Sequence, residues 1–264
     1  MTTDDDAFTG SRRMPWHELP RAVRTGTEDV LGGTVTAATS QRGGFSDRLA
    51  ARLRLADGRR AFAKAVDAGA ARGVAERLTP APRLNSGGVS PRLGGWARLA
   101  DSPRSLAKPA VVAPDAARAL DGHLALEARL PEAIAGETPA HGDLYPFNVL
   151  ITDARVVVVD WPHAWTGPAY ADLVMLLGSV ALSGLAPEPY AARHPLLRGV
   201  DPEAVDVLIS AQAGFLLAAA CSMDSADADA GAGAGTGTGT DPRLEAMMTG
   251  LGRGALRWLS SRRG

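Results

Sequence analysis

Alternation of apolar and charged side chains marks a β-rich region near the beginning of the chain. Between residues 48 and 55, leucine or alanine at the odd positions alternates with arginine at 48, 52 and 54, the period-2 pattern of a strand with one buried face. Asp57-Gly58 follows, a dipeptide typical of hairpin turns, and predicts a returning strand over 61–66. An earlier strand over 34–36 and a short helix over 16–23 complete the predicted elements of this region.

Apolar side chains at helical spacing dominate the rest of the chain. In the last segment, leucine, methionine and tryptophan recur at intervals of three or four residues, the pattern of a helix with one buried face. One short strand candidate, 96–99, lies in a stretch rich in glycine, proline, serine and arginine. The predicted helices span 70–78, 114–130, 171–183, 203–220 and 242–260.

These two patterns predict an α+β chain with two lobes. Residues 1–105 are expected to form a β-rich lobe and residues 106–264 a helical lobe. From about 225 to 241 the sequence consists mainly of glycine, alanine, threonine and aspartate, with no large side chains to pack. This segment predicts a flexible tether before the last helix.

Composition narrows the class of protein. The 264 residues are 45% hydrophobic and 22% charged, within the range of globular proteins and long enough for a sizeable core. A formal net charge of -1 does not predict nucleic-acid binding. Cys221 is the only cysteine, the first six residues do not resemble a signal peptide, and the apolar run 173–185 is too short to span a bilayer. We therefore expect a cytoplasmic monomer or homodimer without a membrane partner.

The segment 141–148 and the strand after it carry the clearest candidate chemistry. His141-Gly142-Asp143 opens a loop, Asn148 follows five residues after Asp143, and Asp160 lies twelve residues further, after the valines 156–159. Kinase-type enzymes supply a base and two magnesium ligands in this order and approximate spacing. Carboxylate and amide oxygens are hard ligands that suit magnesium. The pattern predicts phosphoryl transfer, with Asp143 as the base and Asn148 and Asp160 on the metal.

Two other interpretations of the same residues are weaker. Glycine, aspartate, proline and asparagine are common in surface turns, so the loop alone is not diagnostic. His141, His163 and the aspartates also suggest a metal hydrolase, but no histidine pair has the spacing of a zinc motif. A bracing role for His141 through hydrogen bonds fits the pattern better.

The β-rich region offers candidate nucleotide contacts. Gly43 and Gly44, with Ser46, lie between two predicted strands, where backbone N–H groups can approach phosphate oxygens, although such a turn is often only a hairpin. Lys64 is one of two lysines in an arginine-rich chain and could contact the nucleotide phosphates from a strand. Glu76 on the predicted helix could orient it. A solvated lysine, and a Glu76 paired with Arg72, are the alternatives.

Together these residues resemble the aminoglycoside phosphotransferase family of kinase-like small-molecule phosphotransferases. The resemblance is carried by residues 141–148, 159–161 and 167–173, within a broader likeness over about 30–220. It implies a bilobal protein-kinase-like fold, ATP (in some members GTP) as the donor, and Mg²⁺. It also implies transfer of the γ-phosphate to a hydroxyl of a small molecule, such as an aminoglycoside-type antibiotic. Asp172, near the start of a helix, would brace the catalytic loop.

Two features keep a non-catalytic nucleotide-binding module open as an alternative. Trp161-Pro162 follows Asp160 where protein kinases have an aromatic residue and a glycine, and the segment 79–105 is short for a hinge with adenine contacts. The acceptor is open as well. One hypothesis is that Asp201, Glu203 and Asp206 hold the amines of a cationic acceptor.

Overall fold

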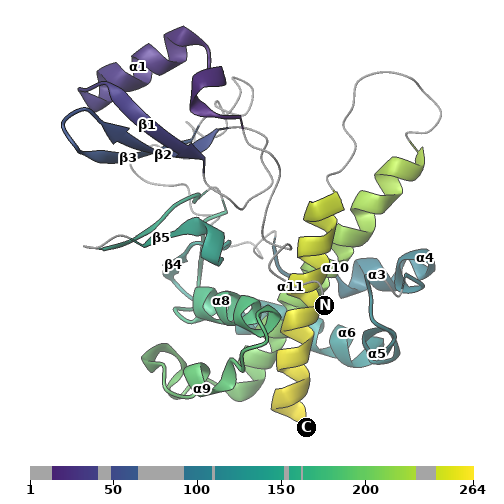
Figure 1. Ribbon diagram of the computed structural model, residues 1–264. Coiled ribbons are helices and arrows are strands. Elements are labelled where there is room, and N and C mark those ends of the chain that lie inside the picture. The colour runs from purple at the N-terminus through teal and green to yellow at the C-terminus, as the bar shows by residue number, and fades with distance from the viewer. Residues whose placement is uncertain are drawn as a thin grey trace. The chain divides into compact units, whose positions relative to one another are not determined.

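The structure is a computed structural model that describes residues 14–40, 49–64, 92–108, 111–151, 155–161, 163–229 and 242–264. The chain forms two compact units, Met1–Thr79 and Pro80–Gly264 (Figure 1). The first contains an antiparallel sheet and the second is mainly helical, so the predicted α+β class is confirmed. The predicted helix over 70–78 lies outside the described residues.

In the described part of the first unit, a three-stranded antiparallel sheet in the order β1-β2-β3 is accompanied by one α-helix and one 3₁₀ helix. The predicted hairpin is confirmed: β2 pairs with β3, and Gly58 in the turn has a positive φ of 85°. In β2 the leucines are buried and the arginines exposed, as the alternation predicted. The elements are η2 (Trp16–Glu18), α1 (Arg21–Leu31), β1 (Val35–Ser40), β2 (Ala50–Leu55) and β3 (Arg60–Lys64).

In the described part of the second unit, the first elements are five short helices. They are α3 (Trp96–Ala100), α4 (Pro103–Leu106), α5 (Pro114–Arg118), α6 (Leu120–Ala128) and α7 (Leu130–Ala133). The predicted strand over 96–99 is wrong, because this segment is α3. The Glu127 carboxylate accepts hydrogen bonds from the first N–H groups of α3, and Trp96 is fully buried with its ring stacked on His123. Tertiary contacts therefore outweigh the weak local preference of four residues.

The central part of the second unit contains two small antiparallel β-ladders. β4 (Thr138–Ala140) pairs with β7 (Trp165–Gly167), and β5 (Val149–Ile151) pairs with β6 (Val156–Val158). The valine strand is therefore confirmed. The 3₁₀ helix η3 (Pro146–Asn148) connects the loop after β4 to β5.

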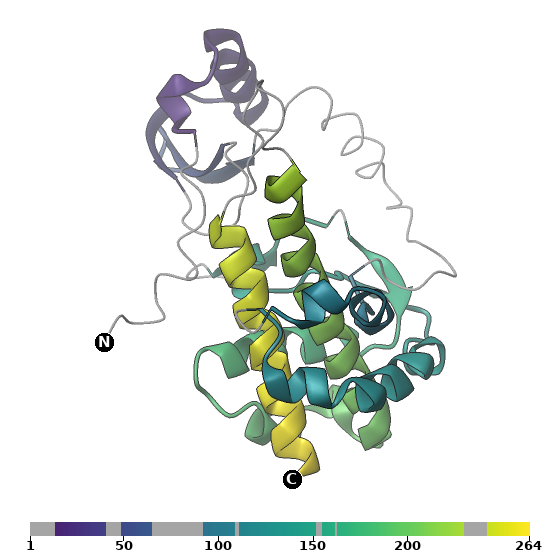
Figure 2. The same cartoon turned by 90° about the vertical axis from the view of Figure 1, so that its right-hand side faces the viewer.

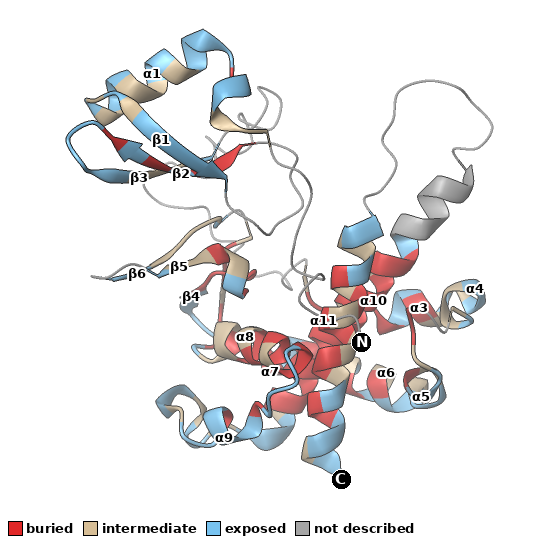
Figure 3. Ribbon diagram, viewed as in Figure 1, coloured by how far each residue is buried: buried red, intermediate tan, exposed pale blue. Residues whose placement is uncertain are grey.

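The remaining helices complete the described part of the second unit. They are α8 (Ala171–Leu182), α9 (Glu188–Ala191), η4 (Pro195–Leu197), α10 (Pro202–Asp229) and α11 (Pro242–Arg263). Helices α10 and α11 lie side by side (Figure 2), and buried residues follow α8, α10 and α11 (Figure 3). Within α10, Pro202–Ser222 is long and apolar enough to cross a membrane, but 83% of the most apolar stretch is buried inside the unit. We therefore interpret it as the core helix.

Two boundaries differ from the prediction. Helix α10 runs to Asp229, so residues 225–229 of the expected tether are helical, because alanine favours continuing a helix that is already formed. Residues 230–241 lie outside the described part. The units divide between Thr79 and Pro80 rather than near residue 105. Leu93, Trp96 and Leu99 pack into the core of the second unit, and their segment therefore belongs with it.

Candidate functional site

Asp143 lies in the loop between β4 and η3, with only 7% of its surface exposed. Nη1 of Arg92 donates to its Oδ1 at 3.0 Å, and Nδ2 of Asn148 donates to its Oδ2 at 3.2 Å. Each carboxylate oxygen therefore has one donor, whereas a carboxylate offers about four lone-pair positions. The Asp143 side chain keeps the capacity to accept a further hydrogen bond, for example from a hydroxyl group.

Asn148 is tied to the same loop by its side chain and by its backbone. Its Nδ2 also donates to the backbone oxygen of Asp143 at 2.8 Å, and its own backbone oxygen accepts from the N–H of Val159 at 2.9 Å. Because the amide nitrogen faces Asp143, the amide oxygen Oδ1 is the atom of Asn148 that can bind a cation. The side chain is buried, which fixes its orientation.

His141 and Asp172 hold the beginning of the loop. The carboxylate of Asp172, in the first turn of α8, accepts from the backbone N–H groups of His141 at 2.6 Å and Gly142 at 3.0 Å. The N–H of Asp143 donates to Nδ1 of His141, so Nε2 carries the ring proton and donates to the oxygen of Val159 at 3.0 Å. Both ring nitrogens are thus used in bracing the loop.

Gly142 occupies a position that only glycine fits. Its φ is 74°, and a Cβ there would lie 2.3 Å from the backbone oxygen of His163. A side chain would therefore meet both an unfavourable backbone conformation and a fixed backbone atom. The glycine allows the loop to pass close to the segment that follows Asp160.

Asp160, a predicted magnesium ligand, has a strained backbone conformation. Its φ of 71° is the one positive value at a non-glycine residue in the described part of the chain. Such residues cluster at functional sites, where the surrounding structure holds them. The pairing of Val149 with Val158 brings Asn148 and Asp160, which flank β5 and β6, to the same end of the ladder. Trp161 then packs edge-on against His141, with ring centroids 4.7 Å apart.

Arg92 is the site residue that sequence reasoning missed. It lies 51 residues before Asp143 in a Gly- and Pro-rich segment, and arginine is common throughout the chain. The Gly94-Gly95 pair after it was the one local indication of a constrained backbone. Besides Asp143, Arg92 contacts Nε2 of His163 through Nη2 at 2.6 Å, and its guanidinium lies 6.0 Å from the centroid of the Phe215 ring.

The electrostatics of Asp143 reflect opposing influences. Burial raises the pKa of the Asp143 carboxyl above its usual value, whereas the nearby Arg92 guanidinium lowers the pKa and the nearby Asp160 carboxylate raises it. Tyr145 beside it is fully buried, which raises its pKa to about 12. Its hydroxyl accepts from Nε2 of Gln212 at 3.1 Å, which ties the loop to α10.

The predicted residues of the first unit are only partly described. Lys64 ends β3, pairs with Ala50 in the sheet and is exposed. Gly43, Gly44, Ser46 and Glu76 lie outside the described residues. The structure thus brings together the predicted residues of the second unit, which are His141, Asp143, Asn148, Asp160 and Asp172.

The chemistry of the donor set fits a magnesium ion better than a transition metal. Within the described ranges, no group of three histidine, cysteine, aspartate or glutamate side chains could hold a metal by itself. An amide oxygen from Asn148 and a carboxylate from Asp160 match magnesium, which uses few protein ligands together with phosphate oxygens. His163 faces the cationic Arg92, so its contact does not support the metal-hydrolase interpretation.

The acidic group at the start of α10 is not arranged as the cationic-acceptor hypothesis expected. Oδ1 of Asp206 pairs with Nε of Arg262 at 2.6 Å, and Oδ2 pairs with Nε of Arg263 at 3.0 Å. Glu203 pairs with Arg129. Oδ1 of Asp201 accepts from the N–H of Glu203 in the first turn of the helix. These carboxylates hold the protein's own groups, so the hypothesis is not supported.

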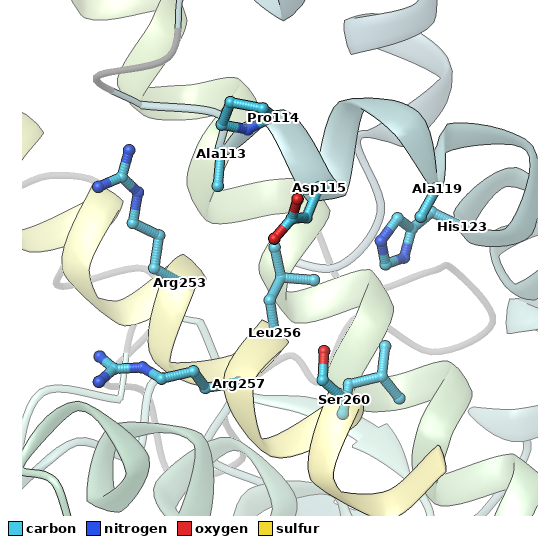
Figure 4. A pocket seen from close by; sticks show the side chains of 11 residues that line it. Ala113, Pro114, Asp115, Ala119, His123, Arg253, Leu256, Arg257 and Ser260 are labelled. Carbon is cyan, nitrogen blue, oxygen red and sulfur yellow. The ribbon is translucent and has the colours of Figure 1, made fainter. Parts of the chain in front are cut away.

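A hollow of about 710 Å³ lies between α5, α6 and α11 (Figure 4). Arg253 and Arg257 line it together with Asp115, His123 and apolar side chains, and none of its lining residues belongs to the loop 141–148. Asp115 pairs with Arg118, and Nε of Arg253 donates to a backbone oxygen. Its mixed charges therefore favour no single class of ligand.

Comparison with known proteins gives one match, to a family model. A family model described as the phosphotransferase enzyme family (APH) matches residues 18–208, more than half of the chain. The match includes Asp143, Asn148, Asp160 and Asp172. Neither the curated proteins nor the solved structures give a match.

Proposed function

The chain belongs to the phosphotransferase enzyme family, and on this premise we propose that it transfers the γ-phosphoryl group of ATP to a hydroxyl of a small molecule. Kinases of this family generally use ATP and Mg²⁺. GTP is the second donor to test.

Asp143 is proposed as the base. The acceptor hydroxyl would donate a hydrogen bond to its carboxylate. As the new P–O bond to the acceptor forms and the bond between the γ-phosphorus and the leaving ADP oxygen breaks, the hydroxyl proton passes to Asp143. In a loose transition state the proton leaves late, so a carboxylate of modest basicity is sufficient, and positioning contributes most.

Asn148 and Asp160 are proposed as the magnesium ligands. When bound, Mg²⁺ neutralises charge on the nucleotide phosphates. The observation that carries the proposal is the pair of hydrogen bonds from Nδ2 of Asn148 to Asp143 at 2.8 and 3.2 Å. These bonds connect the candidate base directly to a candidate metal ligand, and they leave the amide oxygen of Asn148 for the metal.

Acceptors with few positive charges are candidates on an equal footing with polycationic antibiotics. The carboxylates that were candidates for binding substrate amines, Asp206 and Glu203, pair with arginines of the chain itself. A panel should therefore contain aminoglycosides as well as neutral sugars and nucleosides.

The test is ATP consumption and phosphorylated product across this panel, with Asp143→Asn as the matched variant. We expect turnover with at least one acceptor and its loss in the variant. Equal turnover in the variant would contradict the role of Asp143. Nucleotide binding without turnover of any acceptor would favour the non-catalytic module.

Magnesium dependence is tested separately by calorimetry. We expect ATP to bind more tightly with Mg²⁺ than without it, and Asp160→Ala to remove most of that difference. Equal affinity in the parent protein under both conditions would exclude the proposed metal role.

A further inference from the structure

The geometry around Asp143 points to Arg92 as a positioning residue: we propose that Arg92 fixes the carboxylate of Asp143 in the orientation required for phosphoryl transfer. The inference rests on the proposed function and adds to it a residue from a distant part of the chain.

Two donors from distant parts of the chain hold the two oxygens of the Asp143 carboxylate. Arg92 binds Oδ1 at 3.0 Å, and Asn148 binds Oδ2 at 3.2 Å. A carboxylate held at both oxygens cannot rotate about its terminal bond without losing one contact. Its lone pairs therefore keep a constant direction, which matters because catalysis by positioning is sensitive to displacements of about 1 Å.

Arginine is suited to this role because its planar guanidinium has donors on both terminal nitrogens. While Nη1 binds Asp143, Nη2 contacts Nε2 of His163 at 2.6 Å. The guanidinium also lies near the face of the Phe215 ring, with 6.0 Å between its central carbon and the ring centroid. A lysine could supply the charge but could not span the same partners.

The backbone after Arg92 is fixed to the core of the second unit. The N–H of Gly94 donates to the oxygen of Ala211 on α10 at 2.9 Å. Gly95 packs so closely on α10 that a Cβ there would lie 2.5 Å from the oxygen of Gly214. Both carboxylate oxygens of Glu127 accept from the N–H groups that begin α3. Helix α10 thus supports Arg92, while Gln212 on the same helix supports Tyr145 in the loop.

The experiment compares Arg92→Ala, Arg92→Lys and Arg92→Gln with the parent protein. Arg104→Ala is the control, because Arg104 is an exposed arginine on α4, twelve residues further along the chain. The readouts are kcat, the KM values for ATP and the acceptor, the melting temperature, and recovery of Arg92→Ala by added methylguanidine. Hydrolysis of ATP by water is measured in parallel.

We expect Arg92→Ala to lower kcat roughly 10- to 100-fold, with the KM for ATP within about threefold of the parent, because a misplaced base affects the chemical step. Methylguanidine should restore kcat several-fold in Arg92→Ala but not in Asp143→Asn. Arg92→Lys should recover only part of the loss. Arg104→Ala should match the parent.

Different outcomes identify different failures. Parent-like kcat in all three Arg92 variants would overturn the positioning role while leaving the proposed function intact. Loss of kcat with a parallel fall in melting temperature and no recovery by methylguanidine would also overturn it, in favour of a structural role. No turnover by the parent with any acceptor or with water would reject the proposed function, and the inference with it.

Discussion

Two groups of carboxylates in the second unit differ in what holds them. In the loop group, Asp143 accepts one bond at each oxygen, from Arg92 and from Asn148. At the start of α10, Asp206 also accepts at both oxygens, but from two arginines of the C-terminal end of α11. The two aspartates are similarly buried, with 7% and 8% of their surfaces exposed.

The comparison shows that burial alone does not separate a functional carboxylate from a structural one. The partners do. Asp206 joins α10 to the end of α11 through ion pairs with two arginines, whereas Asp143 has one ion pair, with Arg92, and a second bond from the Asn148 amide. The strained backbone at Asp160 accompanies the first group and is consistent with a site kept for ligand binding.

The largest expected effects come from replacing one aspartate of each group with asparagine, which removes the charge and keeps the shape of the side chain. Asp143→Asn should lower kcat by roughly 10²- to 10⁴-fold, the usual contribution of a general base. The change in unfolding free energy should be small, because burial raises the pKa of Asp143 and so already disfavours its charged form. Asp206→Asn should keep kcat within a few-fold and lower the unfolding free energy by roughly 2–3 kcal/mol, because two arginines lose their partner. Steady-state kinetics and urea denaturation measure both. A loss of stability in Asp143→Asn together with a loss of kcat in Asp206→Asn would contradict the comparison.

A substitution that leaves all carboxylates in place tests the loop backbone. Gly142→Ala should lower the unfolding free energy by about 3–4 kcal/mol, since a left-handed conformation and a clash with the oxygen of His163 add up. Gly184→Ala is the matched control: Gly184 has a φ of 78°, but a Cβ there would have nothing within 4 Å, so about 1 kcal/mol is expected. Equal losses in urea denaturation would show that close packing at Gly142 is unimportant.

The stability of the protein at acid pH tests a buried histidine, His123, which belongs to neither carboxylate group. Burial lowers the pKa of His123 from 6.5 to about 4, and Nδ1 is 3.0 Å from the hydroxyl of Ser210 on α10. The unfolded chain binds this proton more readily, so stability should fall as the pH drops from about 6.5 to about 4, by up to about 3 kcal/mol. In His123→Gln, the unfolding free energy from urea denaturation should depend less on pH in this window. An unchanged pH dependence in the variant would contradict the assignment.

The smallest effect is expected at the exposed member of the α10 group. Glu203 and Arg129 form an ion pair with side chains 49% and 43% exposed. Water and salt screen such pairs, so Glu203→Gln should change the melting temperature less than any variant above, and the difference should vanish at high salt. A loss comparable to that of Asp206→Asn would show that exposure does not govern the contribution of these pairs.

The sequence by itself determined the elements whose contacts are local. The β2–β3 hairpin follows from alternation and from Asp57-Gly58, and the long helices α8, α10 and α11 follow from apolar spacing. The loop 141–148 is also largely local, because Asp143 and Asn148 are five residues apart and bond to each other directly. Short-range geometry leaves such a motif few alternatives, so the family could be identified from it.

Only the tertiary structure decided which distant groups meet. Residues 96–99 form a helix because Glu127 caps their N–H groups and Trp96 enters the core, neither of which a four-residue pattern contains. Arg92 reaches Asp143 from 51 residues away, and Asp206 pairs with arginines 56 and 57 residues further on. In a chain where arginine is common, a single arginine carries little information about its partner. Packing supplies that information, since it fixes which backbone segments approach one another and which charges they bring together.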